Sequence, residues 1–274
     1  MKIQKVDIFR PNKKISVNIP RTVESCLLAL DRFLVYLAEH RNADILENFI
    51  PALEEKYKSE ALNSFNNANS LDLSNLNILM ETPELLEATI ALILTLLDVP
   101  KNYNWESQEI NLPQINATKA WVVPKYYYAK QLTELIDKKE AHQFLKDYFE
   151  FYVNTYRKAS KFEDLNSVHE SDIEGVTKNE NGAWRSVVIN NGRYVSRVTN
   201  CMAHEALKVF NDPELAYIVC CSSDSALIKK INENFVLTRT STLMNGPYCD
   251  FCTHDTRIVD KVEHLSKEFF ESLG

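Results

Sequence analysis

One stretch decides how the second half of the chain is built: WRSVVINNGRYVSRV, residues 184–198. Asn191 and Gly192 separate two segments, Trp184–Ile189 and Arg193–Val198, that are rich in β-branched residues. Asn-Gly is the strongest short signal of a hairpin turn, because both central residues of a type I′ turn need positive φ. The stretch therefore predicts an antiparallel β-hairpin.

The segments around this hairpin predict a mixed α+β region. We expect helices over Cys201–Phe210, from Asp212-Pro213 to about Cys221, and over Ile258–Leu273, and strands over Phe235–Met244 and Tyr248–His254. The acidic stretch Phe162–Asn181 is interpreted as a connector.

The first half of the chain has the apolar spacing of helices. Helical patterns cover Pro20–Arg41, Ala43–Tyr57, a segment from Pro83 to about Leu97 with Thr82 as its N-cap, and Ala141–Arg157. We interpret Asn63–Asn77 as a loop and Asn102–Asn116 as extended or irregular. The expected fold class is α+β: a helical region over residues 1–160 and, over residues 161–274, an α+β domain built on antiparallel hairpins that carries the active site.

Composition narrows the possible partners. Lys and Arg number 31 against 38 Asp and Glu, for a net charge of −7, which argues against a nucleic-acid binder. The most apolar run, Leu85–Val99, is too short to span a bilayer, which takes a helix of about 20 residues. An apolar helix of this kind could instead support a homodimer. Six cysteines without an export signal indicate free thiols in the cytoplasm. We expect a small-molecule substrate and neither nucleic-acid nor membrane partners.

Nucleotide chemistry is disfavoured by missing motifs. The sequence has no G-x-G-x-x-G, Walker A, H-E-x-x-H or G-x-S-x-G motif, and its five glycines leave little material for a phosphate-binding loop. We expect no cofactor, and a divalent metal stays an open alternative.

Five of the six cysteines lie between Cys201 and Cys252, and the last two form a C-x-x-C motif. If Tyr248–His254 is a strand, Cys249 and Asp250 point to opposite faces, and Cys252 shares the face of Asp250. Two thiols on opposite faces cannot chelate one metal or form a redox disulfide. The alternative to a metal or redox site is one buried thiol and one thiol near a pocket.

Three further groups have both a chemical and a structural interpretation. Asp224 raises the pKa of nearby Cys221, so it would orient a histidine or act as a base toward water, or it caps a helix from Ser225. Arg239, mid-strand, either clamps a carboxylate or is solvated. His204, one helical turn after Cys201, either pairs with that thiol or is its neighbour only.

Two other clusters are interpreted mainly as structural. His169, Glu170, Asp172 and Glu174 could bind a cation, but a solvated acidic segment explains them better. Tyr126, Tyr127 and Tyr128 could stack on a ligand, but adjacent helical residues point in different directions, so most of them are interpreted as structural.

The order of motifs after Thr199 adds a family resemblance. The motifs are Cys220-Cys221-x-x-Asp224, Arg239-Thr-Ser-Thr-Leu, the turn at Gly246 and Cys249-Asp-Phe. This order resembles the L-2-amino-thiazoline-4-carboxylic acid hydrolase family over about the last 75 residues, with Pro247 where that family has an acidic residue after the turn glycine.

The resemblance implies a hydrolase that opens a small cyclic amidine or thiazoline carboxylic acid at a C–N or C–S bond, with C–N cleavage as the expected reaction. In the name-giving reaction, water opens 2-amino-thiazoline-4-carboxylate to N-carbamoyl-cysteine. The implied catalytic residues are Cys249 as nucleophile with Cys221 as the second choice, His204 as acid or base, and Asp224 or Asp250. The implied substrate-binding residues are Arg239, Tyr248 and Cys201.

Two other functions stay open on the same scaffold. One is a non-catalytic small-molecule-binding module, because the C-terminal half resembles vinyl-4-reductase-type domains. The other is a biosynthetic tailoring enzyme that condenses or cyclises its substrate instead of hydrolysing it.

Overall fold

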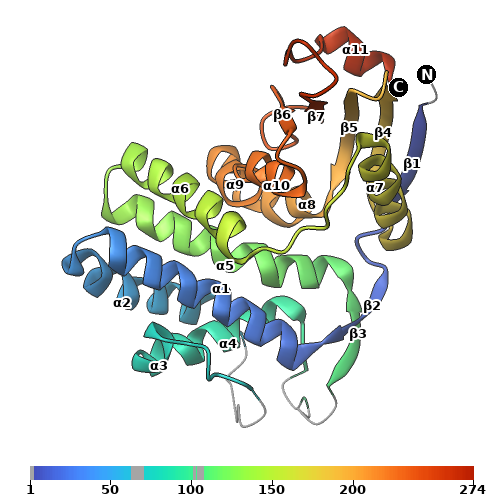
Figure 1. Ribbon diagram of the computed structural model, residues 1–274. Helices are drawn as coiled ribbons and strands as arrows, with labels where there is room; N and C mark the ends of the chain where they lie inside the picture. The colour runs from blue at the N-terminus through green and yellow to red at the C-terminus, as the bar shows by residue number, and fades with distance from the viewer. Residues whose placement is uncertain (1–2, 63–70, 101–102, 104–107) are drawn as a thin grey trace. The chain divides into compact units, whose positions relative to one another are not determined.

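A computed structural model describes residues 3–62, 71–100, 103 and 108–274 (Figure 1). The chain divides into two compact units, one formed by Met1–Pro11 with Phe149–Gly274 and the other by Asn12–Tyr148. The expected loop at residues 63–70 and part of the segment at 102–107 lie outside the described residues.

The first unit is built on a five-stranded sheet with the strand order β1-β4-β5-β7-β6, and every pair in it is antiparallel. The strands are β1 (Gln4–Phe9), β4 (Asn181–Ile189), β5 (Arg193–Cys201), β6 (Phe235–Thr238) and β7 (Cys249–Asp255). The sheet and its helices confirm the α+β class.

The turn between β4 and β5 confirms the expected hairpin but lies one residue earlier than expected. Asn190 and Asn191 adopt positive φ values of 47° and 56°, and the Gly192 N–H donates to the Ile189 carbonyl over 3.0 Å. Gly192 is needed for space instead, because a Cβ there would lie 2.8 Å from Cγ1 of Val259.

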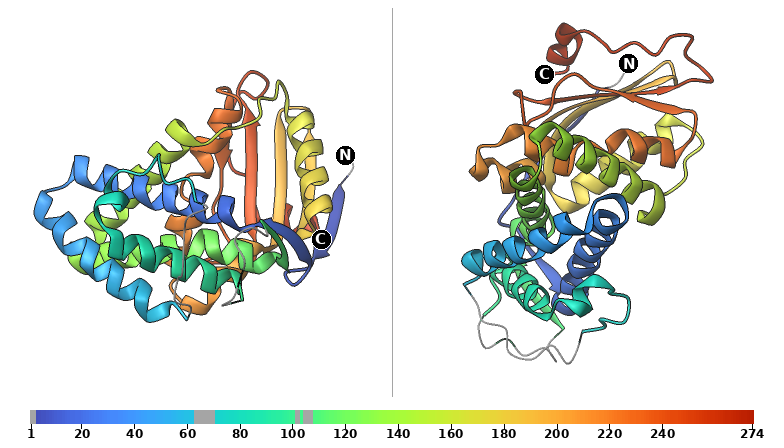
Figure 2. Two further views of the ribbon diagram at one scale, coloured as in Figure 1. Left: turned by 90° about the horizontal axis from the view of Figure 1, so that it is seen from below. Right: turned by 90° about the vertical axis from the view of Figure 1, so that its left-hand side faces the viewer.

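The two faces of the sheet pack against different helices (Figure 2). On one face, Val195 and Cys252 pack with Phe270 of α11 (Lys267–Ser272). On the other face, Tyr194 and Phe235 pack with residues of α7 (Leu165–Asn179) and α10 (Asp224–Ile231). Successive residues of β7 therefore face different layers.

The remaining helices of this unit follow the sequence closely. They are α8 (Met202–Leu207), the short 3₁₀ helix η1 (Lys208–Phe210) and α9 (Pro213–Cys220). Asp212 caps α9 by accepting from the Leu215 N–H over 3.2 Å, and Pro213 begins the helix.

Four expectations for this unit were wrong. Phe162–Asn181 is mostly helix α7, and Ile258–Leu273 is helical only over Lys267–Ser272. The strand expected over Phe235–Met244 ends at Thr238. Residues 4–9, assigned to the helical region, form β1 and pair with β4.

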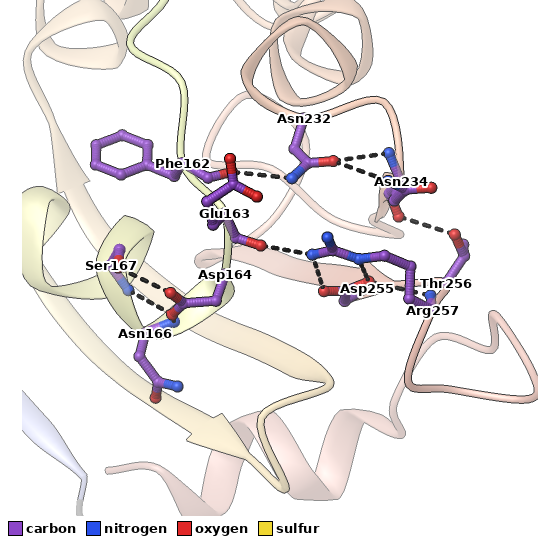
Figure 3. Close-up of polar contacts among 10 residues, drawn as sticks. All are labelled: Phe162, Glu163, Asp164, Asn166, Ser167, Asn232, Asn234, Asp255, Thr256 and Arg257. Atoms are coloured by element: carbon purple, nitrogen blue, oxygen red, sulfur yellow. Dashed lines mark hydrogen bonds and ion pairs between the residues drawn. The ribbon is translucent and has the colours of Figure 1, made fainter.

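A polar network joins the beginning of α7 to the end of β7 (Figure 3). Asp164 caps α7 by accepting from the Asn166 and Ser167 N–H groups. Arg257 binds the buried Asp255 carboxylate with Nε and Nη2, at 2.9 and 2.6 Å, and also donates to the Glu163 carbonyl. These bonds explain why the acidic stretch before α7 is ordered.

The second unit is helical, with a two-stranded sheet of β2 (Lys14–Asn18) and β3 (Glu109–Pro113). Its helices are α1 (Ile19–His40), α2 (Ala43–Glu60), α3 (Ile78–Glu81), α4 (Pro83–Leu97), α5 (Gln114–Leu135) and the first part of α6 (Lys138–Tyr156). Phe33 stacks on Tyr128 at 4.2 Å between ring centroids, and Tyr126 and Tyr127 are also buried. Their burial is what the structural interpretation of the tyrosines requires.

Within the described ranges, no helix combines the length and the apolar character needed to cross a bilayer. The apolar helix α4 has 15 residues and ends at Leu97, and its C-cap residue Asp98 adopts a left-handed φ of 59°.

Candidate functional site

Arg239 lies at the centre of the cluster that the sequence singled out. It follows directly after β6, and its side chain is only 9% exposed. The guanidinium carbon lies 5.2 Å from the ring centroid of Tyr217 and 5.1 Å from that of Phe251. These cation–π contacts with two rings hold the guanidinium in a buried site.

The guanidinium nitrogens of Arg239 bind groups of the protein itself. Nη1 donates to Asp224 Oδ2 over 2.6 Å, and Nη2 donates to the Cys221 carbonyl over 2.9 Å and to the Tyr217 hydroxyl over 3.2 Å. The sequence predicted that Arg239 lies in the middle of a strand and gave a solvated side chain as one alternative. Both are wrong, because Arg239 follows the end of β6 and its side chain is buried. A substrate carboxylate would have to compete with Asp224 for it.

Asp224 is the more accessible partner of this ion pair. It is the first residue of α10, whose N-cap is Ser223, and 29% of its side chain remains exposed. Burial raises the pKa of Asp224, and the charge of Arg239 opposes that shift. The structural alternative placed Asp224 itself as the cap, whereas it lies one position inside the helix.

Three thiols surround this ion pair and interact with it electrostatically. Burial raises the pKa of Cys249 to about 12, and it also raises the pKa values of Cys201 and Cys221. The Asp224 carboxylate raises all three further, whereas Arg239 lowers those of Cys221 and Cys249. The thiols are therefore protonated near neutral pH.

Backbone N–H groups contact two of these thiols. The Leu243 N–H donates to Cys249 Sγ over 3.2 Å. Hydrogen bonds from the backbone of His204 and Ala203 partly offset the rise in the pKa of Cys201. Cys201 and His204 are thus neighbours through the His204 backbone.

Asp250 and Tyr248 lie on the opposite face of the sheet from Cys249. Asp250 is 4% exposed, accepts from the Thr240 and Ser241 N–H groups over 2.8 and 2.7 Å, and also binds the Thr240 hydroxyl. Tyr248 packs in the apolar cluster that contains Cys252 and Phe270. The expected separation of Cys249 from Asp250 is confirmed, and it parts Asp250 and Tyr248 from the other candidate residues.

His204 lines a cavity of about 210 Å³ formed by α8, η1, the start of α9 and Met244. Burial lowers the pKa of His204, and the charge of Lys208 lowers it further, so the imidazole is neutral near pH 7. Lys208 and Asp212 also line the cavity.

The cavity and the Arg239 cluster are built from the same three stretches of the chain. Ala216 lines the cavity beside Tyr217 in sequence, and Met244 lines it beside Leu243. The third stretch contains His204, whose backbone binds Cys201. The cluster and the cavity therefore share α8, α9 and the segment after β6.

Sequence reasoning missed two residues of this cluster, Tyr217 and Phe251. Phe251 was detectable, because strand alternation places it on the face of Cys249. Tyr217 lies one helical turn before Cys221, but nothing in the sequence pairs it with Arg239, which comes 22 positions later.

A metal site is not evident among the described residues, where no group of three or more His, Cys, Asp or Glu side chains is placed to bind an ion. None of the six cysteines forms a disulfide. Cys249 and Cys252 face opposite layers, as the alternation predicts.

A comparison with protein families matches residues 116–253 to the model of L-2-amino-thiazoline-4-carboxylic acid hydrolase, just over half of the chain. The chain belongs to this hydrolase family. The match begins well before the 75 residues that the motifs indicated and includes Asp224, Arg239 and Cys249. No curated protein and no solved structure matches the chain.

The matched residues of this family member run from α5 into β7. They leave out β1 and everything after Thr253, including His254, His264 and α11. The outer strand of the sheet and the layer that covers one of its faces therefore lie outside the matched range.

Proposed function

We propose that this protein adds water to the amidine carbon of a small cyclic amidine that carries a carboxylate, as in 2-amino-thiazoline-4-carboxylate. The observation that supports this proposal is the buried Arg239–Asp224 pair, whose carboxylate remains partly exposed among the thiols. Family membership supports hydrolysis as the reaction class.

Asp224 is the group best suited to bind the amidine. A protonated amidine presents two N–H donors in a plane, which matches the two oxygens of a carboxylate. Arg239 occupies Oδ2 of Asp224 at 2.6 Å and favours its charged form, against the burial that raises its pKa. In this proposal Arg239 acts through Asp224 rather than by binding the substrate carboxylate.

The substrate carboxylate then needs another cation. Lys208 lines the cavity beside His204, and its Nζ lies 2.8 Å from Glu205 Oε2 with half of its side chain exposed. An exposed ion pair of this kind is weak and exchanges partners at small cost. Lys208 is therefore our candidate for the carboxylate.

The protonation states of the candidate residues favour water as the nucleophile. A thiol attacks as thiolate, and the pKa of about 12 leaves Cys249 protonated in the free protein. His204, neutral near pH 7, suits a general base. It takes a proton as water oxygen bonds to the amidine carbon and returns that proton to the ring atom that leaves.

Two ring bonds of the amidine carbon are open to cleavage. Loss of sulfur gives N-carbamoyl-cysteine, the product of the name-giving reaction, with a free thiol. Loss of the ring nitrogen, the C–N cleavage that the family resemblance implies, gives S-carbamoyl-cysteine with a free amine. Both products gain one water, so mass alone does not separate them.

The test is incubation of the protein with L-2-amino-thiazoline-4-carboxylate, followed by mass spectrometry and by separate thiol and amine reagents. We expect a gain of one water, and a loss of activity of about a hundredfold or more in Asp224→Asn. Asp260→Asn, the same change at an exposed position, is the control and should keep full activity.

Cys249→Ser separates the two nucleophiles. Turnover that survives in this variant supports water, whereas turnover that disappears there but survives in Cys221→Ser returns the attack to Cys249. Binding without chemical change in the wild type would favour the ligand-binding module. Condensation or cyclisation without consumption of water would favour a tailoring enzyme.

We further propose a reducing compartment such as the cytoplasm. The absence of a disulfide among the six cysteines supports this setting.

A further inference from the structure

A second polar cluster lies behind Arg239, on the sheet face that packs against α11. We call it the polar clasp, and it consists of Thr238, Thr240, Asp250, His254 and His264. The Asp250 carboxylate accepts from the Thr240 and Ser241 N–H groups and from the Thr240 hydroxyl. The Asp250 N–H in turn donates to the Ser241 carbonyl over 3.2 Å.

The clasp also holds the residue before Arg239. The Thr238 hydroxyl lies 2.9 Å from Nε2 of His254 and 3.0 Å from Nδ1 of His264. The other nitrogen of His264, Nε2, lies 3.2 Å from Asp250 Oδ2, although this contact is not aligned as a hydrogen bond. Residues on both sides of Arg239 are therefore fixed from one face.

The arrangement explains how Arg239 stays in place beyond the end of β6. The side chains of Thr238 and Thr240 bind groups on one face of the sheet, whereas the Arg239 side chain reaches Asp224 and Tyr217 on the other. The backbone at Arg239 has no ladder partner to hold it, because the β6–β7 register ends at Thr238 with Cys252. Asp250 supplies the missing backbone partners.

His264 connects this cluster to the C-terminal segment. It lies in the irregular stretch before α11 and stacks on Phe270 at 5.1 Å between ring centroids. Both residues lie after the end of the family match at Thr253. The C-terminal segment with α11, which His264 connects to Asp250, therefore lies outside the residues that match the family.

We propose that Asp250 and His264 are positioning residues, which hold the backbone of residues 239–241 so that Arg239 stays against Asp224. The Asp250 carboxylate binds Thr240 and Ser241, on the other face of the sheet from the Arg239 side chain, so it acts through the chain and not on a substrate. The effect on turnover rests on the proposed function, whereas the effect on Arg239 does not.

The first test observes Arg239 without any substrate. In NMR spectra of the full chain, the guanidinium Nε–Hε signal of Arg239 is assigned by its loss in Arg239→Lys. We expect Thr240→Val and His264→Gln to shift or broaden this signal, and Thr240→Ser, which keeps the hydroxyl, to restore it. Thr256→Val is the control: it removes one hydroxyl hydrogen bond, from Thr256 to the Asn234 carbonyl just after the end of β7, and should leave the signal unchanged.

The second test measures catalysis. Asp250→Asn and His264→Gln should lower kcat/KM about tenfold, because the Asp224 carboxylate, which binds the amidine in the proposed function, shifts when Arg239 is no longer held against it. An unchanged Arg239 signal in folded Thr240→Val and His264→Gln would overturn the positioning role. If the wild type fails to turn over the substrate, the proposed function fails, and the NMR test still decides the role of the clasp.

Discussion

At the scale of single residues, the function we propose depends on one arginine and the groups around it. Strand alternation predicted that Cys249 and Asp250 face opposite layers, because the side-chain period of a strand is two whatever its neighbours are. The place of Arg239 was not predictable in this way. It depends on where β6 ends, and the backbone just beyond that end binds Asp250, 11 residues further along the chain than Arg239.

Removal of the Asp224 charge should make the nearby thiols more acidic. Burial is the first cause of the raised pKa of Cys221, and the Asp224 carboxylate is the second, while Arg239 opposes both. In Asp224→Asn the repulsion disappears and the attraction of Arg239 remains, so the pKa of Cys221 falls but stays above its ordinary value.

The pH dependence of alkylation by iodoacetamide, followed for the Cys221 peptide by mass spectrometry, measures this change. We expect severalfold faster alkylation in the variant at pH 8 and a midpoint at lower pH. Cys26 lies in the other unit and provides the internal control. An unchanged midpoint would show that Asp224 does not interact with the thiol.

At the scale of helices and strands, the sequence predicted elements with local signals and missed those set by distant contacts. The strands around Asn190 and helix α9 after Asp212-Pro213 were found from turn and cap residues. The expected helix over Ile258–Leu273 fails in its first half, because Ile258 and Val259 pack over Gly192 and the Arg257 side chain binds Asp255. Apolar spacing alone does not reveal such contacts.

The turn at Asn190 gives a stability prediction. Its φ of 47° is left-handed, which costs an ordinary residue about 1–2 kcal/mol and a β-branched one no less. Because Asn190 is exposed, Asn190→Val should lower the free energy of unfolding by about that amount, whereas Asn190→Gly should change it by less than about 0.5 kcal/mol.

Urea unfolding of both variants against the wild type measures this difference. An equal effect of valine and glycine would mean that the side chain of Asn190, and not its backbone, stabilises the turn. Gly192→Ala is a separate case, because its cost comes from contact with Val259 and not from φ.

At the scale of the whole molecule, the sheet of the first unit combines strands from both ends of the described chain. Val6 of β1 pairs with Trp184 of β4, across all of the second unit in sequence. The alternation of Lys5, Val6, Asp7 and Ile8 is typical of a strand, but the six residues of β1 do not indicate which strand they pair with. Local sequence patterns do not predict long-range strand pairing of this kind.

The stability of this unit should depend on pH through two buried groups, His254 and Asp172, whose effects on stability have opposite signs. Burial, followed by the charges of Arg193 and His264, lowers the pKa of His254 from 6.5 to about 4. The unfolded chain therefore binds a proton more readily, and stability is lost as the pH falls below about 6.5. Burial raises the pKa of Asp172 from 3.8 to about 6, although Tyr194 donates to it over 3.0 Å. Here the folded chain holds the proton, and stability is lost as the pH rises toward 6.

Measurements of unfolding by urea at pH 5.0 and 7.5 separate these two effects. Wild type should gain about 2 kcal/mol more than His254→Gln between these pH values, since about 1.5 pH units lie between pH 5 and the unfolded pKa. Relative to Asp172→Asn, the wild type should instead lose about 1 kcal/mol of unfolding free energy over the same interval, because Asp172 contributes only over the one pH unit between pH 5 and its folded pKa of about 6. The comparison is between variants, so other titrating groups cancel. If both variants deviate from the wild type in the same direction, at least one of the two burial arguments is wrong, and the sign of each difference tells which.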